Sequence, residues 1–163
     1  MGSPAIDVGD HFTYRHYRTW PEEERWELIE GQAWSMSPAP TRGHQDIQAR
    51  LITALRNLLK GKSCKAYDAP FDVLLPEADD EIETIVQPDI VGFCDRTKLR
   101  DYGAREYWVV DPGNTSIQAW RLKADGGYDK GELRDMIHGP SPIASRILAG
   151  FVVDPKELFA DLD

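Results

Sequence analysis

The chain has 163 residues, of which 41% are hydrophobic and 29% are charged, as is usual for a soluble globular protein with a core of its own. Its formal net charge is −9, from 28 acidic residues and 19 Lys or Arg residues. This balance argues against strong non-specific binding to nucleic acid, which needs a basic face. No window approaches the roughly 20 apolar residues that cross a bilayer, so we expect no membrane partner.

The length fits a single domain over residues 1–163, with a polar lead-in over 1–25 and a core over 26–160. The N-terminus has neither a basic region nor an apolar stretch, so it is not typical of a secretion signal. A cytoplasmic location is therefore expected. Cys64 and Cys94 lack the spacing of metal ligands, and in a cytosolic protein we expect them to be free thiols.

A β-hairpin is predicted around Glu30-Gly31. The segments 26–30 and 32–36 on either side are short, apolar and aromatic, with imperfect alternation, and glycine suits the tight turn between them. The stretch 37–40, Ser-Pro-Ala-Pro, predicts a rigid turn after the second strand.

A helix is predicted from Gly43 to Lys60, where apolar residues recur at three- and four-residue spacing. Gly61 is a suitable stop. The apolar stripe consists of Ile47, Leu51, Ala54, Leu55 and Leu58.

His44 and Gln45 lie at the N-terminal end of this helix, where free backbone N–H groups favour anions, so they could lie beside a phosphate. His44 could equally cap or pack the first turn. Six basic residues in this region could form a local basic groove, or a solvated helix face whose basic C-terminal end suits the helix dipole. They are Arg42, Arg50, Arg56, Lys60, Lys62 and Lys65.

The stretch from Ile85 to Phe93 is mostly β-branched and apolar, which predicts a buried strand. Pro88 has no N–H to give a sheet. A buried Asp89 carboxylate would need a partner, and metal ions are the usual ones. We therefore expect a sheet that opens locally to hold a charged ligand. The alternative is an edge strand with Asp89 in water.

Strand-like residues 66–75 precede this stretch and end at Pro76, and the acidic residues 77–81 predict a solvated turn. If the two strands pair as a hairpin, Asp72 would approach the same end of the sheet as Asp89. A slip of one residue would turn its side chain to the other face, so the register stays open.

The C-terminal part predicts short strands and a last helix. Asp154 and Pro155 are a typical N-cap and first-turn proline for that helix. One long helix on a mainly antiparallel or mixed sheet predicts an α+β or α/β domain. The expected strands are 105–110, 116–122, a short strand at 128, 133–137 and 145–153, with a turn at 111–114.

Several blocks, in this order and spacing, resemble the bacterial restriction endonucleases of the Uma-two type, a branch of the PD-(D/E)XK nuclease superfamily. The likeness runs from about Tyr14 to Ala160. The blocks are Trp26–Gly31, Met36–Pro40, His44-Gln45, Phe71–Val73, Gln87–Val91, Gly103–Pro112 and Leu148–Phe151.

The resemblance implies a restriction-endonuclease-like mixed sheet with one long core helix and an N-terminal hairpin. It also implies an enzyme that cuts phosphodiester bonds in DNA with Mg²⁺ or Mn²⁺, since a cation offsets transition-state charge and acidifies the attacking water.

Asp89 matches the metal-binding aspartate of that superfamily, and Asp72 is a second candidate ligand. Glu30 and His44 are further catalytic candidates, although Glu30 could be an exposed acid at a hairpin end. The nucleic-acid candidates are Gln45 and Arg42.

The chain departs from the family pattern after Asp89. The family has a strand with a second acid and a lysine there, whereas only residues 95–102 lie before the next matching block. Lys98 falls in an expected loop, and Glu106 lies in what matches the following strand, so neither is assigned. The chain is therefore either an endonuclease or a non-catalytic relative acting by binding or self-association. Pairing through an exposed sheet edge would give a homodimer.

Overall fold

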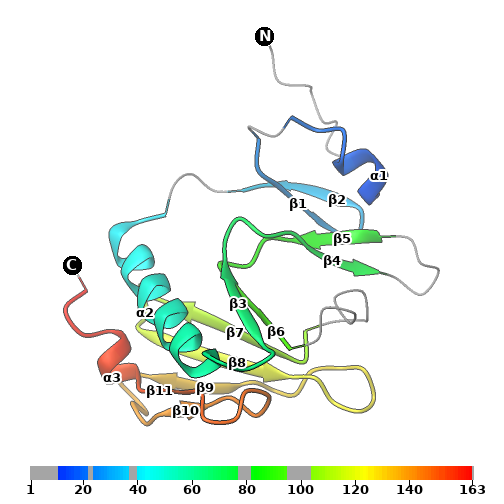
Figure 1. The fold of residues 1–163 in the computed structure, drawn as a ribbon. Coiled ribbons are helices and arrows are strands. Elements are labelled where there is room, and N and C mark those ends of the chain that lie inside the picture. Colours follow the sequence, from blue (N-terminus) through cyan, green and yellow to red (C-terminus); the bar gives the residue numbers. More distant parts are fainter. Residues whose placement is uncertain (1–10, 22–23, 37–39, 77–81, 95–103, 163) are drawn as a thin grey trace. The chain divides into compact units, whose positions relative to one another are not determined.

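The computed structural model describes residues 11–21, 24–36, 40–76, 82–94 and 104–162. The chain forms two compact units (Figure 1). Unit 1 consists of residues 1–39 and 67–102, and unit 2 of residues 40–66 and 103–163.

Four antiparallel strands form the main sheet of unit 1, in the order β2-β1-β5-β4. Leu28 and Ile85 lie opposite each other on the two central strands, and neither is exposed to solvent. The segment that ends at Pro76 pairs with the segment that contains Ile85, with Val73 opposite Val86, which is the hairpin that the sequence left open. The strands are β1 (Trp26–Ile29), β2 (Gln32–Ser35), β4 (Val73–Pro76) and β5 (Ile82–Val86).

The predicted hairpin around Glu30-Gly31 is confirmed, because β1 and β2 pair directly on either side of it. Both turn residues have positive φ, 51° for Glu30 and 75° for Gly31, as a two-residue turn that follows the twist of the strands requires. A Cβ at Gly31 would lie 2.2 Å from the His11 ring. Glycine is thus required there by both its conformation and the close approach of His11.

Residues 11–21 pack onto the same unit through aromatic side chains. They contain the short helix α1 (Tyr14–Tyr17). The Trp20 ring lies edge-on to Phe12 and Trp26, with centroids 5.3 and 5.8 Å away, and Phe12 donates its N–H to the Gly31 carbonyl over 2.8 Å. These contacts hold residues 11–21 against the hairpin.

The expectation of one buried strand from Ile85 to Phe93 is wrong. β5 ends at Val86, and a separate strand, β6 (Ile90–Phe93), pairs with β3 (Lys65–Asp68) in another sheet. Pro88 cannot donate to a ladder, which explains the interruption. The rings of Tyr67 and Phe93 stack beside this break, with centroids 5.4 Å apart.

In unit 2, the predicted long helix is confirmed as α2 (Arg42–Leu59). Its buried face differs from the predicted stripe: Ala54 is exposed and Leu51 and Leu58 are half-buried. The buried face is rotated toward Ile47, Ile52, Leu55 and Leu59. Spacing alone leaves this choice open, because two neighbouring stripes of the helix are apolar.

The remaining elements of unit 2 are an antiparallel sheet in the order β7-β8-β9, a two-stranded ladder, and a terminal helix (Figure 1). Ile117, Ala119 and Ile143 form its fully buried centre. Asp154 caps the terminal helix by accepting the Lys156 N–H, as predicted. The elements are β7 (Glu106–Asp111), β8 (Ser116–Arg121), β9 (Glu132–Asp135), β10 (Ile143–Ala144), β11 (Val152–Val153) and α3 (Pro155–Leu158).

The predicted α+β class is confirmed, with one long helix and antiparallel ladders. None of the helices in the described ranges has the length and apolar character needed to cross a membrane.

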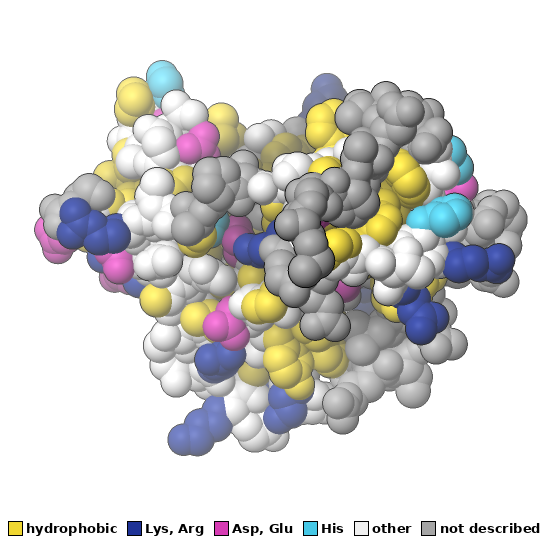
Figure 2. All heavy atoms as spheres, turned by 90° about the horizontal axis from the view of Figure 1, so that it is seen from above, with side chains coloured by type: hydrophobic (Ala, Val, Ile, Leu, Met, Phe, Trp, Pro, Cys, Tyr) yellow, Lys and Arg dark blue, Asp and Glu magenta, His cyan; other side chains and the backbone are white. Residues whose placement is uncertain are grey.

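Neither Cys64 nor Cys94 is a free thiol, so the expectation of free thiols is wrong. Hydrophobic side chains also reach the surface among charged ones (Figure 2), including Trp34, which is 58% exposed, and Ile137, which is 80% exposed.

Candidate functional site

Asp89 lies in the break between β5 and β6, and its side chain is exposed. Of the two alternatives that the sequence left open, the exposed side chain agrees with an Asp89 in water and not with a buried carboxylate, because the strand that would have buried it ends three residues earlier. The backbone of Asp89 is fixed, since its carbonyl accepts the Ala69 N–H over 2.9 Å. Its role as a metal ligand stays a prediction.

Gln87, two residues before Asp89, forms hydrogen bonds through its backbone N–H and through both the oxygen and the nitrogen of its side-chain amide. Its backbone N–H donates to Glu27 Oε1 over 2.7 Å. Its amide oxygen accepts two bonds from the Arg25 guanidinium, at 2.9 and 3.2 Å. Its amide nitrogen donates to Asp72 Oδ1 over 2.8 Å and to the Tyr17 hydroxyl over 3.2 Å. The segment that leads into Asp89 is therefore fixed by side chains from three distant parts of unit 1.

Tyr17 completes this arrangement by donating its hydroxyl to Asp72 Oδ1 over 3.2 Å. Burial raises the pKa of the Tyr17 hydroxyl above its ordinary value. The hydrogen bond from Gln87 opposes that rise, and the nearby Asp72 charge adds to it. The hydroxyl therefore stays protonated at neutral pH and remains a donor to Asp72.

Asp72 directly precedes β4 and lies beside Gln87, which directly follows β5. Asp72 therefore lies at the end of the β4–β5 hairpin from which the chain continues through Gln87 to Asp89. Both bonds to Asp72 fall on Oδ1. Its other oxygen is the one that could face a cation.

Glu30 belongs to the opposite end of β5. Its N–H donates to Thr84 Oγ1 over 3.2 Å, and Thr84 precedes Gln87 by three residues, or roughly 10 Å along a strand. Ligands of one metal ion lie within about 2.6 Å of it. The structure therefore does not bring Glu30 together with Asp72, whereas Glu27 accepts the Gln87 N–H.

Sequence reasoning missed Glu27, Gln87 and Tyr17. Glu27 alternates with the buried Leu28 on β1, and Leu28 pairs with Ile85 on β5. That register carries Glu27 toward the end of β5. The alternation was visible in the sequence, but the pairing partner of β1 was not.

In unit 2, the polar candidates lie at the start of α2. Thr41 caps this helix, because its hydroxyl oxygen accepts the His44 N–H over 3.3 Å. Arg42 and Gln45 are exposed, and His44 is half-buried. The capping function belongs to Thr41 rather than to the His44 side chain, and binding of a phosphate by His44 or Gln45 stays a prediction.

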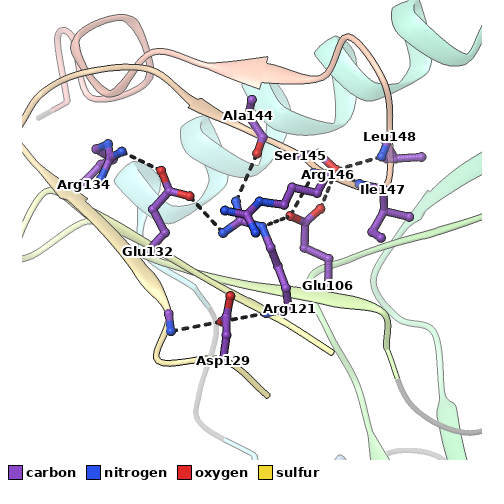
Figure 3. A network of polar contacts seen from close by, with 11 residues as sticks. Glu106, Arg121, Asp129, Glu132, Arg134, Ala144, Ser145, Arg146, Ile147 and Leu148 are labelled. Atoms are coloured by element: carbon purple, nitrogen blue, oxygen red, sulfur yellow. Dashed lines mark hydrogen bonds and ion pairs between the residues drawn. The ribbon is translucent and has the colours of Figure 1, made fainter. Parts of the chain in front are cut away.

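Glu106, the acid that could have replaced a missing ligand, is bound instead to Arg121 (Figure 3). The two residues lie opposite each other on β7 and β8. Arg121 Nε lies 3.1 Å from Glu106 Oε1, and both side chains are more than nine-tenths buried. Arg121 also contacts Glu132 Oε2 at 2.9 Å and donates to the Ala144 carbonyl over 3.2 Å.

The second oxygen of Glu106 is occupied as well. It accepts the Ser145 hydroxyl, while Oε1 also accepts the Arg146 N–H over 3.2 Å. Ser145 Oγ in turn accepts the N–H groups of Ile147 and Leu148 (Figure 3). A carboxylate with both oxygens bonded in this way stabilises the fold and is not placed to bind a metal ion.

The donor chemistry at the end of the β4–β5 hairpin suits Mg²⁺ or Mn²⁺, because both prefer carboxylate oxygens. Mg²⁺ often takes only one or two carboxylates together with water and substrate phosphate. Over the residues that the structure describes, no group of three or more His, Cys, Asp or Glu could hold a metal ion. Asp95 and Lys98 lie outside the described residues.

A family model described as "Uma2: Putative restriction endonuclease" matches residues 14–103. Among solved structures, the chain is similar to a crystal structure described as "a putative nuclease belonging to DUF820 from Anabaena variabilis", with a TM-score of 0.65 and 18% identity. The alignment covers 91% of this chain and 97% of the other, which shows a shared fold. No curated protein matches.

Proposed function

Because this chain belongs to the Uma2 family of restriction endonucleases, we propose that it hydrolyses phosphodiester bonds in DNA with Mg²⁺ or Mn²⁺. The observation that carries the proposal is the family match over residues 14–103, which includes Pro88-Asp89. The shared fold with a protein described as a nuclease supports it. A cytoplasmic location agrees with this function and stays a prediction.

In this proposal Asp89 and Asp72 hold the metal ion. The ion would acidify the attacking water and offset the charge that develops on the phosphate. Gln87 and Tyr17 would orient Asp72 by their hydrogen bonds to Oδ1, as supporting residues commonly do for metal ligands.

The catalytic roles of Glu30 and His44, and DNA contacts by Arg42 and Gln45, remain part of the proposal. Glu30 would act without touching the ion that Asp72 holds.

The test is cleavage of supercoiled plasmid and of single-stranded DNA with Mg²⁺, Mn²⁺ or EDTA. The proposal expects nicking or linearisation with either metal ion and intact DNA with EDTA. Intact DNA under all three conditions, in a preparation that is folded by circular dichroism, would contradict it.

A non-catalytic relative is the second candidate function. Two observations favour it: the described residues contain no group of three metal-binding side chains, and the sequence lacks the expected acid and lysine after Asp89. Such a protein would bind DNA or pair with a second copy through a sheet edge. Light scattering that shows a dimer, together with DNA binding and no cleavage, would favour this function over the first.

A further inference from the structure

Charge is distributed unequally between the two units. Unit 1 contains 17 acidic residues and 6 Lys or Arg residues, whereas unit 2 contains 11 and 13. The units therefore have net charges of −11 and +2, which together give the −9 of the chain. On net charge, unit 2 is therefore the unit that attracts a polyanion, whereas unit 1 needs a cation at Asp72 and Asp89 to offset repulsion of a phosphate.

Within unit 2, the cations concentrate in a segment that contains no acid. No Asp or Glu occurs between Asp46 and Asp68, and five Lys or Arg residues fall between them. Arg50 is already used, because its guanidinium donates to three carbonyl oxygens at the end of α3, at 2.7, 2.8 and 3.1 Å. Arg56 also has a partner.

The other three cations of this segment are Lys60, Lys62 and Lys65, which we call the basic turn. All three side chains are exposed. Over the described residues, none of them forms an ion pair with a carboxylate. By contrast, Lys123 pairs with Asp125 at 2.9 Å.

The helix dipole accounts for the position of only one of the three lysines in the basic turn. Cations near the C-terminus of a helix are stabilised, but the effect falls off within the last turn. α2 ends at Leu59, and Lys60 is its C-cap. Lys62 lies beyond the helix, and Lys65 is the first residue of β3. These two lysines are therefore not accounted for by the dipole.

The backbone of the basic turn is fixed and open to solvent. Lys62 donates its N–H to the Leu59 carbonyl over 2.9 Å. Gly61 has a φ of 78°, and nothing lies within 4 Å of the position that its Cβ would take. From Lys60 to Lys65 the chain spans at most roughly 18 Å, or about five nucleotides of one strand at 3.4 Å each. Three lysines on such a span can each reach a different phosphate.

We propose that Lys60, Lys62 and Lys65 form the surface through which this chain binds the phosphate backbone of duplex DNA. The identity of the partner rests on the proposed function, whereas the location of the surface rests on the charges and exposure of these lysines. Such contacts neutralise phosphates and release counterions, so they give an affinity that depends steeply on salt but not on sequence.

The test measures binding of a fluorescent duplex by anisotropy, in EDTA, over a series of salt concentrations. The wild type is compared with the triple variant Lys60→Gln, Lys62→Gln, Lys65→Gln. We expect the variant to bind at least about tenfold more weakly at low salt. The slope of log affinity against log salt should shrink by about 0.9 for each lost phosphate contact, or roughly 2.7 in total.

A matched control is the triple variant Lys123→Gln, Lys130→Gln, Lys156→Gln, which removes three exposed lysines of the same unit and leaves the same net charge. It should keep the affinity and the salt slope of the wild type. Replacing the lysines of the basic turn by arginine should keep both as well, because arginine also contacts phosphates.

Equal binding by the wild type and the basic-turn variant would overturn the inference, and so would equal losses in both glutamine variants. It would also be overturned if the wild type bound phosphatidylserine vesicles but no duplex. Failure of the proposed function looks different: lysine-dependent binding in EDTA with no cleavage in Mg²⁺ or Mn²⁺ would leave this inference standing.

Discussion

Gln87 and Asp72 bind each other at the open end of the β4–β5 hairpin, with Gln87 Nε2 2.8 Å from Asp72 Oδ1. The same glutamine receives the Arg25 guanidinium and donates its N–H to Glu27. Gln87 therefore joins the segment before Asp89 to β1 through its backbone N–H, and to the residue before β4 through its side chain.

Replacing Gln87 by leucine should lower the free energy of unfolding by about 1 kcal/mol. The partners left behind are charged or polar, but they are partly exposed and can bind water instead, so the loss lies near the low end for hydrogen bonds. Urea denaturation measures the change. The control, Gln32→Leu on the exposed edge strand β2, should change the free energy by less than about 0.5 kcal/mol. Equal losses in the two variants would contradict the role given to Gln87.

Gly31→Ala should destabilise the chain by about 2 kcal/mol or more. The positive φ costs an L-residue about 1 kcal/mol, and the new Cβ would lie 2.2 Å from the His11 ring. Gly126→Ala is the matched control, because its φ is also positive, at 85°, but nothing lies within 4 Å of its Cβ position. Thermal unfolding should show a larger loss for Gly31→Ala. Equal shifts would mean that His11 moves away at no cost.

Arg121→Met should lower the free energy of unfolding by about 3–5 kcal/mol, because it leaves the buried Glu106 carboxylate without its cation. The double variant with Glu106→Gln should be less destabilised than Arg121→Met alone, since the uncompensated charge is gone. Lys123→Met removes an exposed pair with Asp125 and should cost less than about 1 kcal/mol. Additive losses in the double variant would show that Glu106 and Arg121 are not coupled.

The stability of the chain should fall in acid through Asp111, among other carboxylates. The Asn114 side chain and backbone N–H donate to Asp111 and hold its pKa below the ordinary 3.8. A carboxylate with a lowered pKa stabilises the folded state above its unfolded pKa and loses that contribution as pH falls through the folded pKa. Below about pH 4, Asp111→Asn should therefore lose less stability per pH unit than the wild type in urea titrations. Parallel pH profiles would contradict this.

Local chemistry was enough to predict the hairpin at Glu30-Gly31, the helix α2 and the cap at Asp154, because turn, periodicity and capping signals lie within a few residues. The interruption at Pro88 was also predictable, because proline has no N–H to give a ladder. The contacts that fix Gln87 beside it were not. Its N–H is taken by Glu27, which is 60 residues away, and only the order of strands in the sheet reveals that partner.

The Glu106–Arg121 pair was partly predictable from the sequence. The turn at Asp111 fixes the register of β7 against β8, and that register places the two opposite charges face to face. The candidate site was harder to predict, since its residues come from separate strands. The sequence placed Asp72 at the end of the hairpin that leads to Asp89, but it did not separate Glu30, which lies toward the other end of β5.

The central claim, metal-dependent cleavage of DNA through Asp89, is tested most directly by the rate of plasmid nicking in Mg²⁺ and Mn²⁺. Asp161→Asn is the matched control, because Asp161 is exposed, loses the same charge, and has a φ of 51° that asparagine accepts. We predict nicking by the wild type and the control, and a rate at least about a hundredfold lower for Asp89→Asn. Nicking by Asp89→Asn at the rate of the wild type would contradict it.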